Sequence, residues 1–203
     1  MAVNSVANIL VTGAKLWYAP VGEALPDETS VDYDGAWGGN WAQLGFTLSP
    51  LQISYTQTFF GVDVQQRAGR VKNFPLDNTV VANTTLAEVD GPILAVLMNG
   101  GNTATAAGAS QKGFDSMVFG GKRTITHYAV GFEGVREDEG STPANQPIRL
   151  FFFKATISAS GAIPFDKASP TGIPITVEAM VDPTLTEGEG IGTWHIVTAP
   201  ATA

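Results

Sequence analysis

The sequence predicts a mainly β fold, an antiparallel β-sandwich or barrel with one α-helix and one long β-hairpin. Apolar and polar residues alternate with a period of two over most of the chain. Glycine (23) and proline (12) are frequent between the alternating runs, as turns between short strands require. A compact apolar run with helix-ending signals follows the longest alternation. A chain of 203 residues fits one domain with a sizeable core, so we expect a single domain over residues 1–203.

The charge of the chain excludes several classes of protein. Charged residues make up 15%, below the usual quarter, which indicates a covered or neutral-polar surface. The net charge of −8 argues against a protein that binds nucleic acid of any sequence, because neutralising phosphates takes lysine and arginine. The absence of cysteine excludes disulfides and thiolate metal sites. The chain has no signal-peptide pattern and no apolar run of ~20 residues, so we expect a soluble protein made in the cytoplasm without membrane insertion.

The first forty-odd residues predict two short strands and a long loop. Residues 1–12 have no clear period and form a frayed terminus or an arm. Ala14–Ala19 reads as a strand that Pro20 ends. Residues 21–40 read as a solvated acidic loop, and Trp41–Phe46 as a short strand.

Residues 51–86 carry the longest alternation and predict a long β-hairpin with its turn at residues 67–70. The parity of the first arm changes after Gly61, which predicts a β-bulge there, and Pro75 indicates an edge position or a local break in pairing. The predicted apolar face takes Leu51, Ile53, Tyr55, Phe59, Val62, Val64, Phe74, Leu76, Val80, Ala82 and Leu86. The predicted polar face takes Gln52, Ser54, Thr56, Thr58, Asp63, Gln65, Asn73, Asp77, Thr79, Asn83 and Thr85.

This polar face is unusual for a hairpin surrounded by water. Exposed strands are generally protected from edge pairing by lysine and glutamate, whereas this face is rich in Thr, Ser, Asn and Gln. A two-stranded ribbon of this length is unstable alone in water. The hairpin must therefore lie on a core or be completed by strands from elsewhere.

The second half supplies a helix and the remaining strands. Asp90 is a predicted N-cap with Pro92 in the first turn, and Asn99-Gly100 ends the apolar helix, which must be covered on both sides. Residues 99–113 read as a flexible loop of small residues and residues 198–203 as a C-terminal tail. The predicted strands are Thr124–Phe132, Ile148–Ile157, Ile173–Val181 and Ile191–Val197.

No group of residues in the sequence predicts catalysis or a metal site. His127 and His195 are the two histidines and both lie in predicted strands, so a three-histidine site is impossible. Asp32-x-Asp34-Gly35 lacks the glycine and glutamate spacing of a calcium loop. Gly120–Thr124 lacks the upstream glycine and following helix of a phosphate loop, and no G-x-S-x-G sequence occurs. We expect a protein that is not an enzyme and needs no cofactor.

Residues 13–98 resemble the major tail tube protein of long-tailed, non-contractile bacteriophages. The matching pieces are GAKLWYAPVG, WAQLGFT, the hairpin with VDVQQRAGRVKNF, and TTLAEVDGPILAVLM running into the helix. The order of these pieces and the junction of TLAE with the helix are the most specific parts. Beyond Met98 only the strand-rich composition agrees, and the extra immunoglobulin-like module frequent in that family has no room here.

The resemblance implies a structural virion protein whose hexameric rings stack helically into a hollow tail tube that delivers phage DNA to the host. The hairpins of six subunits would join into one barrel around the channel, with termini and loops as arms between rings. DNA would pass without specific binding, and tape-measure, tail-terminator and baseplate or tip proteins would be further partners. The predicted polar face would then face the lumen, and Arg67 and Arg70 at the turn would contact a neighbouring ring or subunit.

Two other functions remain open. A β-sandwich that binds a receptor or carbohydrate in the virion would fit the same fold class and would expose aromatic residues on loops. Trp37 and Trp41 are the candidates for that role. A hydrolytic enzyme with an unrecognised site is the third.

Overall fold

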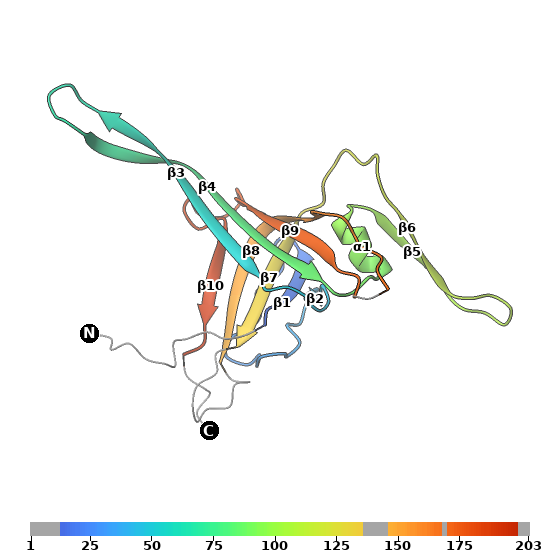
Figure 1. Ribbon diagram of the computed structural model, residues 1–203. Helices are drawn as coiled ribbons and strands as arrows, with labels where there is room; N and C mark the ends of the chain where they lie inside the picture. The colour runs from blue at the N-terminus through green and yellow to red at the C-terminus, as the bar shows by residue number, and fades with distance from the viewer. Residues whose placement is uncertain (1–12, 136–145, 168–169, 199–203) are drawn as a thin grey trace.

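A computed structural model of the chain describes residues 13–135, 146–167 and 170–198. The predicted antiparallel β fold with one helix is confirmed, and Figure 1 shows two long, paired strands leaving the body together as a ribbon. The described elements are β1 (Lys15–Pro20), β2 (Ala42–Gln43), β3 (Gln52–Asp63), β4 (Arg70–Leu86), α1 (Gly91–Leu97), β5 (Gly101–Thr105), β6 (Phe114–Val118), β7 (Tyr128–Val135), β8 (Pro147–Ala159), β9 (Ile173–Met180) and β10 (Gly192–Ile196).

One antiparallel sheet contains most of the strands, in the order β2-β1-β7-β8-β9-β4-β3, with β10 also paired to β8. Strand β8 pairs with β7 and β10 along its first half and with β9 along its second half. Between these halves two residues of β8, Phe153 and Lys154, face the single residue Ala129 of β7. An extra residue of this kind bends a strand. The bend carries β9, β4 and β3 diagonally across β1, β7 and β8, as Figure 1 shows, which makes the two layers of a sandwich.

The apolar core lies between these two layers. Strict alternation in β9 turns Ile173, Ile175 and Val177 inward, where each is at most 1% exposed. The opposite layer contributes Leu16, Val130, Phe132, Leu150 and Phe152, and β4 contributes Val80, Ala82 and Leu86. Burial of these side chains is the main favourable term in the stability of the fold.

Helix α1 begins and ends where the sequence predicts. The Asp90 carboxylate accepts a hydrogen bond from the Gly91 amide at 2.7 Å, and proline follows in the first turn. Ile93, Val96 and Leu97 enter the core. The helix also packs against β5 and β6, which supply the cover that its apolar surface requires.

The predicted flexible loop at residues 99–113 is wrong for its first part. Gly101–Thr105 forms β5 and pairs with β6 from Gly101↔Val118 to Thr105↔Phe114. The sequence GNTAT has no alternation of apolar and polar residues, so this strand was not predicted. This second hairpin projects on the side of the molecule away from the long one (Figure 1).

The loop at residues 21–40 is not simply solvated. Trp37 from this loop, with Trp41 and Trp17, forms a second buried cluster on Phe151, and Trp17 stacks on Trp37 at 4.7 Å between ring centroids. The loop therefore covers the outer face of β1, β7 and β8. Of its acidic residues, Asp27, Asp32 and Asp34 are exposed, whereas Glu28 is partly buried and is held by β8 and β10 as described below.

Two predicted strands are shorter in the structure. Trp41–Phe46 reduces to β2, two residues paired with Trp17 and Tyr18, because Trp41 turns into the second cluster instead. The strand predicted from Thr124 begins at Tyr128. The Asn99 side chain bonds the Thr124 carbonyl and the Thr126 amide, which ties residues 124–126 to the end of α1 rather than to the sheet.

Candidate functional site

Strands β3 and β4 form the long hairpin, and their register decides which side chains share a face. Directly opposed residues of an antiparallel pair lie on one face. Gln52 opposes Asn83, Thr56 opposes Thr79 and Thr58 opposes Asp77. Eight predicted polar residues therefore share one face, here called the polar face: Gln52, Ser54, Thr56, Thr58, Asp77, Thr79, Asn83 and Thr85.

The other three predicted polar residues lie elsewhere. Asp63 opposes Arg70 and Asn73 opposes Gly61. Because β3 alternates without interruption, positions 61 and 63 fall on the face opposite the polar face. By the same alternation Val62, and Phe74 opposite Phe60, fall on the side of the polar face, so their predicted place on the apolar face is wrong. Gln65 lies in the connection between the two strands.

The predicted bulge at Gly61 is wrong in its position and its strand. The extra residues lie in β4: Leu76 is skipped between Thr58↔Asp77 and Phe59↔Pro75, and Val71 is skipped near the turn. Pro75 thus sits beside a bulge, where its missing N–H costs no ladder bond. Gly61 serves another purpose, because a Cβ there would lie 2.6 Å from Cδ and Nε of Arg70, which lies across it.

The opposite face of the hairpin reaches the core only near its base. Val80, Ala82 and Leu86 are buried there, as predicted from the alternation. Beyond them the ribbon leaves the body, and Tyr55, Phe59 and Leu76 are 62%, 49% and 68% exposed. The hairpin therefore carries apolar side chains that the described part of the chain does not cover.

The structure extends the polar face over two further strands. Asn83 opposes Thr176 of β9, which opposes Ser158 of β8, and Val81, Glu178 and Thr156 follow in the next row. Thr176 Oγ1 donates to Asn83 Oδ1 at 2.7 Å, so adjacent strands are also joined by their side chains. The alternation in β9 is visible in the sequence. The strand order, which places these residues beside the hairpin, is not.

Charges on the polar-face side of the sheet are few and of both signs. Asp77 and Glu178 carry the carboxylates. Lys154, in register with Met180, and Lys72, in register with Val62 near the turn, carry the positive charges. Thr79 Oγ1 donates to Asp77 Oδ2 at 3.5 Å. The surface therefore offers polar groups of low charge rather than a cationic site.

The turn of the long hairpin is basic. Arg67 and Arg70 are both exposed, and the Lys72 ammonium lies over the Phe74 ring at 4.6 Å from its centroid. In the described residues no acidic group forms an ion pair with any of these three cations. The turn thus presents unneutralised positive charge on a chain whose net charge is −8.

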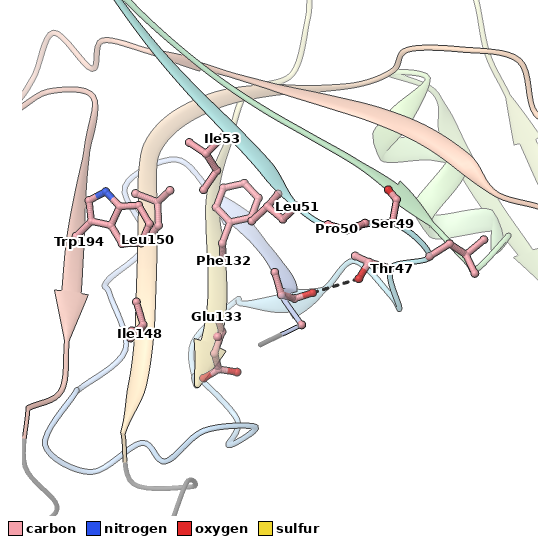
Figure 2. A pocket seen from close by; sticks show the side chains of 14 residues that line it. Thr47, Ser49, Pro50, Leu51, Ile53, Phe132, Glu133, Ile148, Leu150 and Trp194 are labelled. Carbon is pink, nitrogen blue, oxygen red and sulfur yellow. Dashed lines mark hydrogen bonds between the residues drawn. The ribbon is translucent and has the colours of Figure 1, made fainter. Parts of the chain in front are cut away.

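An apolar groove of about 480 Å³ lies beneath the base of β3 (Figure 2). Leu51 and Ile53 border it on one side, and Phe132, Leu150 and Trp194 on the other. The one carboxylate in its lining, Glu133, is fully buried and already engaged. The groove therefore contains no free acid or base for catalysis among its described lining.

Arg149 is the centre of a buried polar network on the far side of the sheet. Its guanidinium donates to Glu133 Oε1 at 3.1 Å from Nε and 2.8 Å from Nη2, and contacts Glu28 Oε2 at 2.5 Å. It also bonds the carbonyls of Val31 and Asp32, and Trp37 Nε1 donates to Glu133. These bonds hold the loop at residues 21–40 against β7 and β8, which is a structural role.

The two histidines do not form a site together. His195 Nδ1 lies 2.9 Å from Glu28 Oε1, and His127 Nδ1 lies 3.3 Å from Thr156 Oγ1. Across residues 13–135, 146–167 and 170–198, no three His, Asp or Glu side chains are grouped so that they could hold a metal ion. In the same ranges no helix has the length and apolar character to cross a membrane.

The two tryptophans considered for carbohydrate binding are buried. Trp37 is 5% exposed and Trp41 is 8% exposed, and each packs on Phe151. The Trp41 indole N–H donates to the Ala24 carbonyl at 2.8 Å. They belong to the second apolar cluster and offer no stacking surface to a sugar.

A family described as phage tail tube protein matches residues 1–194. No curated protein matches the chain.

Proposed function

The chain belongs to the phage tail tube protein family, and on that premise we propose that its copies form stacked hexameric rings whose common channel delivers phage DNA to the host. As a tail tube protein it is a structural component of the virion. The synthesis of the chain in the host cytoplasm before assembly is part of this proposal.

The polar face is the observation that carries the proposal. It runs over β3, β4, β9 and the second half of β8 and is made mainly of Thr, Ser, Asn and Gln. DNA presents phosphates, which bind lysine and arginine. A wall whose two carboxylates balance two lysines gives DNA little net positive charge to bind, so a duplex can slide along it.

The exposed hairpin supports assembly with other copies. Strand β3 is an edge strand, and from Gln52 to Phe60 every residue is exposed. Such a ribbon is unstable alone, and an unprotected edge is a template for pairing. A ring of copies supplies the missing strands and covers apolar residues such as Tyr55 and Phe59.

The ends of the tube would need other proteins. Tape-measure, tail-terminator and baseplate or tip proteins are the partners expected there, and the basic turn with Arg67 and Arg70 would contact the next ring or subunit. DNA would pass through the channel without making specific contacts with the protein.

Negative-stain electron microscopy of the purified protein tests the proposal. We expect rings or tubes with a central hole. A protein that stays monomeric at high concentration, or that forms solid aggregates without a channel, would overturn it. The central hole itself is the readout, so the experiment needs no added DNA.

A further inference from the structure

The core face of the layer formed by β1, β7, β8 and β10 is covered only in part. Leu150 opposes Trp194 and Ile148 opposes Ile196 across the ladder of β8 and β10, so these four side chains share one face. Leu150 is buried in the core, whereas Trp194 and Ile196 are 56% and 53% exposed. The apolar groove of about 480 Å³ lies on this face, where the strands of the other layer leave it open.

The described chain begins at this groove. Gly13 and Ala14 belong to its lining. Thr47 Oγ1 donates to the Ala14 carbonyl at 3.4 Å, the bond drawn dashed in Figure 2, and Leu16 is fully buried in the core. The chain is therefore held at the rim, and residues 1–12 start from the groove itself. Twelve extended residues span at most about 40 Å, enough to cross it.

We propose that residues 1–12 fill the groove of their own copy and complete its apolar core. The segment reads MAVNSVANILVT, with five aliphatic side chains and no charged one: Val3, Val6, Ile9, Leu10 and Val11. In an extended chain Ile9 and Val11 point to the same side. The inference goes beyond the ring proposed above, because the contact lies within a single copy.

The groove suits a segment without charge. Its described lining contains no lysine or arginine, and its carboxylate, Glu133, is fully buried and bonded to Arg149. A charged side chain entering the groove would lose its hydration without gaining a partner. Aliphatic side chains lose no such hydration, and their removal from water favours the contact.

The other segments outside the described ranges fit the groove less well. Residues 136–145 contain Arg136, Glu137, Asp138 and Glu139. Residues 168–169 are alanine and serine, and residues 199–203 consist of alanine, proline and threonine, so neither segment has a large apolar side chain. Of these segments, residues 1–12 alone supply the aliphatic groups that an apolar groove requires.

Covalent attachment favours the segment of the same copy over that of another. A segment joined to its site by a short linker is present there at an effective concentration in the millimolar range. In micromolar protein the segments of other copies are roughly a thousandfold more dilute. Because Gly13 already lines the groove, the linker in this case is only the backbone that leads from it.

Filling the groove would have two effects on the subunit. It would cover an apolar surface that otherwise favours unspecific association with other proteins. It would also place side chains against Leu51 and Ile53, which form one wall of the groove at the start of β3. The segment would thereby steady the base of the long hairpin.

Cysteine cross-linking tests the contact, and the chain suits the method because it contains no cysteine of its own. Ile9→Cys or Val11→Cys is combined with Leu48→Cys or Ile53→Cys, two exposed positions in the lining of the groove. Dilute protein is oxidised with diamide, which takes up the two hydrogens released when a pair of thiols forms a disulfide. Free thiols are then alkylated in denaturant and counted by mass spectrometry, and non-reducing electrophoresis shows the size of the product.

We expect at least one combination to lose both thiols while the protein stays monomeric on the gel. The matched control combines the same cysteine at position 9 or 11 with Thr186→Cys, in the exposed loop after β9, and should keep both thiols. Retention of both thiols in every groove combination would overturn the inference. Covalent dimers would overturn it too, since they would place the segment of another copy in the groove.

A further substitution separates binding in the groove from mere proximity of a tethered segment. Leu10→Asp, added to the combination that reacts best, should slow disulfide formation because a carboxylate cannot enter the apolar groove without cost. Asn4→Asp adds the same charge at a polar position and should slow it less. Equal rates for these two variants would contradict the proposed binding. The readout is made within one copy, so a failed cross-link leaves the ring intact as a proposal, and absence of rings leaves this contact intact.

Discussion

Arg149 and Glu133 form an ion pair in which both side chains are fully buried, with Nη2 2.8 Å from Oε1. The pair lies between the sheet and the loop at residues 21–40, and Glu28 binds the same guanidinium. Removing one partner of a buried pair leaves an uncompensated charge, which costs about 3–5 kcal/mol.

The Arg149→Met variant should therefore lose about 3–5 kcal/mol of stability. For a chain of this size that corresponds to a fall in Tm of roughly 10 °C, measured by circular dichroism. Lys15→Met is the control, since it removes the partly exposed pair with Asp34 and should cost less than ~1 kcal/mol. Equal Tm values for the two variants would show that the buried network does not hold the loop.

Gly131 allows the Trp37 ring to lie directly on β7. A Cβ at this position would come within 2.3 Å of Trp37 Cζ3 and 3.4 Å of Phe151 Cδ1, in a packed cluster that cannot give way easily. We expect Gly131→Ala to lose about 1–3 kcal/mol and to change the near-ultraviolet circular dichroism of the tryptophans. Gly101→Ala is the matched control, because no atom lies within 4 Å of its added Cβ. An unchanged spectrum for Gly131→Ala would contradict the close packing.

A positive charge on the polar face should impair DNA delivery without preventing assembly. Thr56→Lys and Thr79→Lys place an ammonium group on that face, at an exposed and at a partly exposed position respectively. Because lysine binds phosphate, passing DNA would be held back. The measurement compares tube formation by electron microscopy with DNA ejection from phage that carry the variant. Thr186→Lys, in the exposed loop after β9, is the control; unchanged ejection in the polar-face variants, or failed assembly, would count against the lumen assignment.

The basic turn should contribute to contacts between copies. Arg67→Ala removes an exposed guanidinium whose positive charge can pair with the acidic surface of another copy, since the chain carries a net charge of −8. We expect tubes to form only at higher protein concentration and to be less sensitive to salt, as followed by sedimentation. Lys112→Ala, in the turn of the second hairpin, should leave both properties unchanged. Identical assembly curves for the unmodified protein, Arg67→Ala and Lys112→Ala would contradict a contact at the turn of the long hairpin.

Asp182 gives a prediction about pH. Hydrogen bonds from the backbone N–H and then the hydroxyl of Thr184 lower the pKa of the Asp182 carboxyl below its ordinary value. A carboxyl whose pKa is lower in the folded state adds stability above its unfolded pKa, and this stability is lost as the pH falls through the folded pKa. In Thr184→Val the backbone bond remains, so the pKa should rise only part of the way back. NMR titration of the carboxyl measures this pKa. An unchanged pKa would show that the Thr184 hydroxyl does not lower it.

Local pattern was sufficient to predict the hairpin, the helix and the inner face of β9. Each depends on neighbours in sequence: a two-residue alternation, an Asp90 cap, and the apolar positions Ile173, Ile175 and Val177. The eight residues of the polar face followed from the same rule. Asp63 and Asn73 were assigned to the wrong face of the hairpin. The bulges lie in β4, where neither a glycine nor a change in the alternation marks their positions.

What the sequence left undetermined depends on residues far apart in the chain. Glu28 looked like one acid among five in a loop, since its partners Arg149 and His195 lie in β8 and β10. Thr176 and Ser158 could not be joined to the hairpin without the strand order. Trp37 and Trp41 looked exposed because their cover, Phe151, belongs to a strand that reads as apolar on both faces.

The contact of Glu28 with His195 also has a consequence for the time at which the chain becomes ordered. The two residues are 167 positions apart, and Glu28 and Arg149 are 121 apart. During synthesis the segment around Glu28 leaves the ribosome long before either partner exists, and contacts this distant in sequence form late in folding. The tryptophan-bearing loop can therefore contact Arg149 and Phe151 once β8 has been made, whereas its contact with His195 requires β10. A chain that ended before β10 would keep the bonds of Arg149 to the loop and lose the contact of Glu28 with His195.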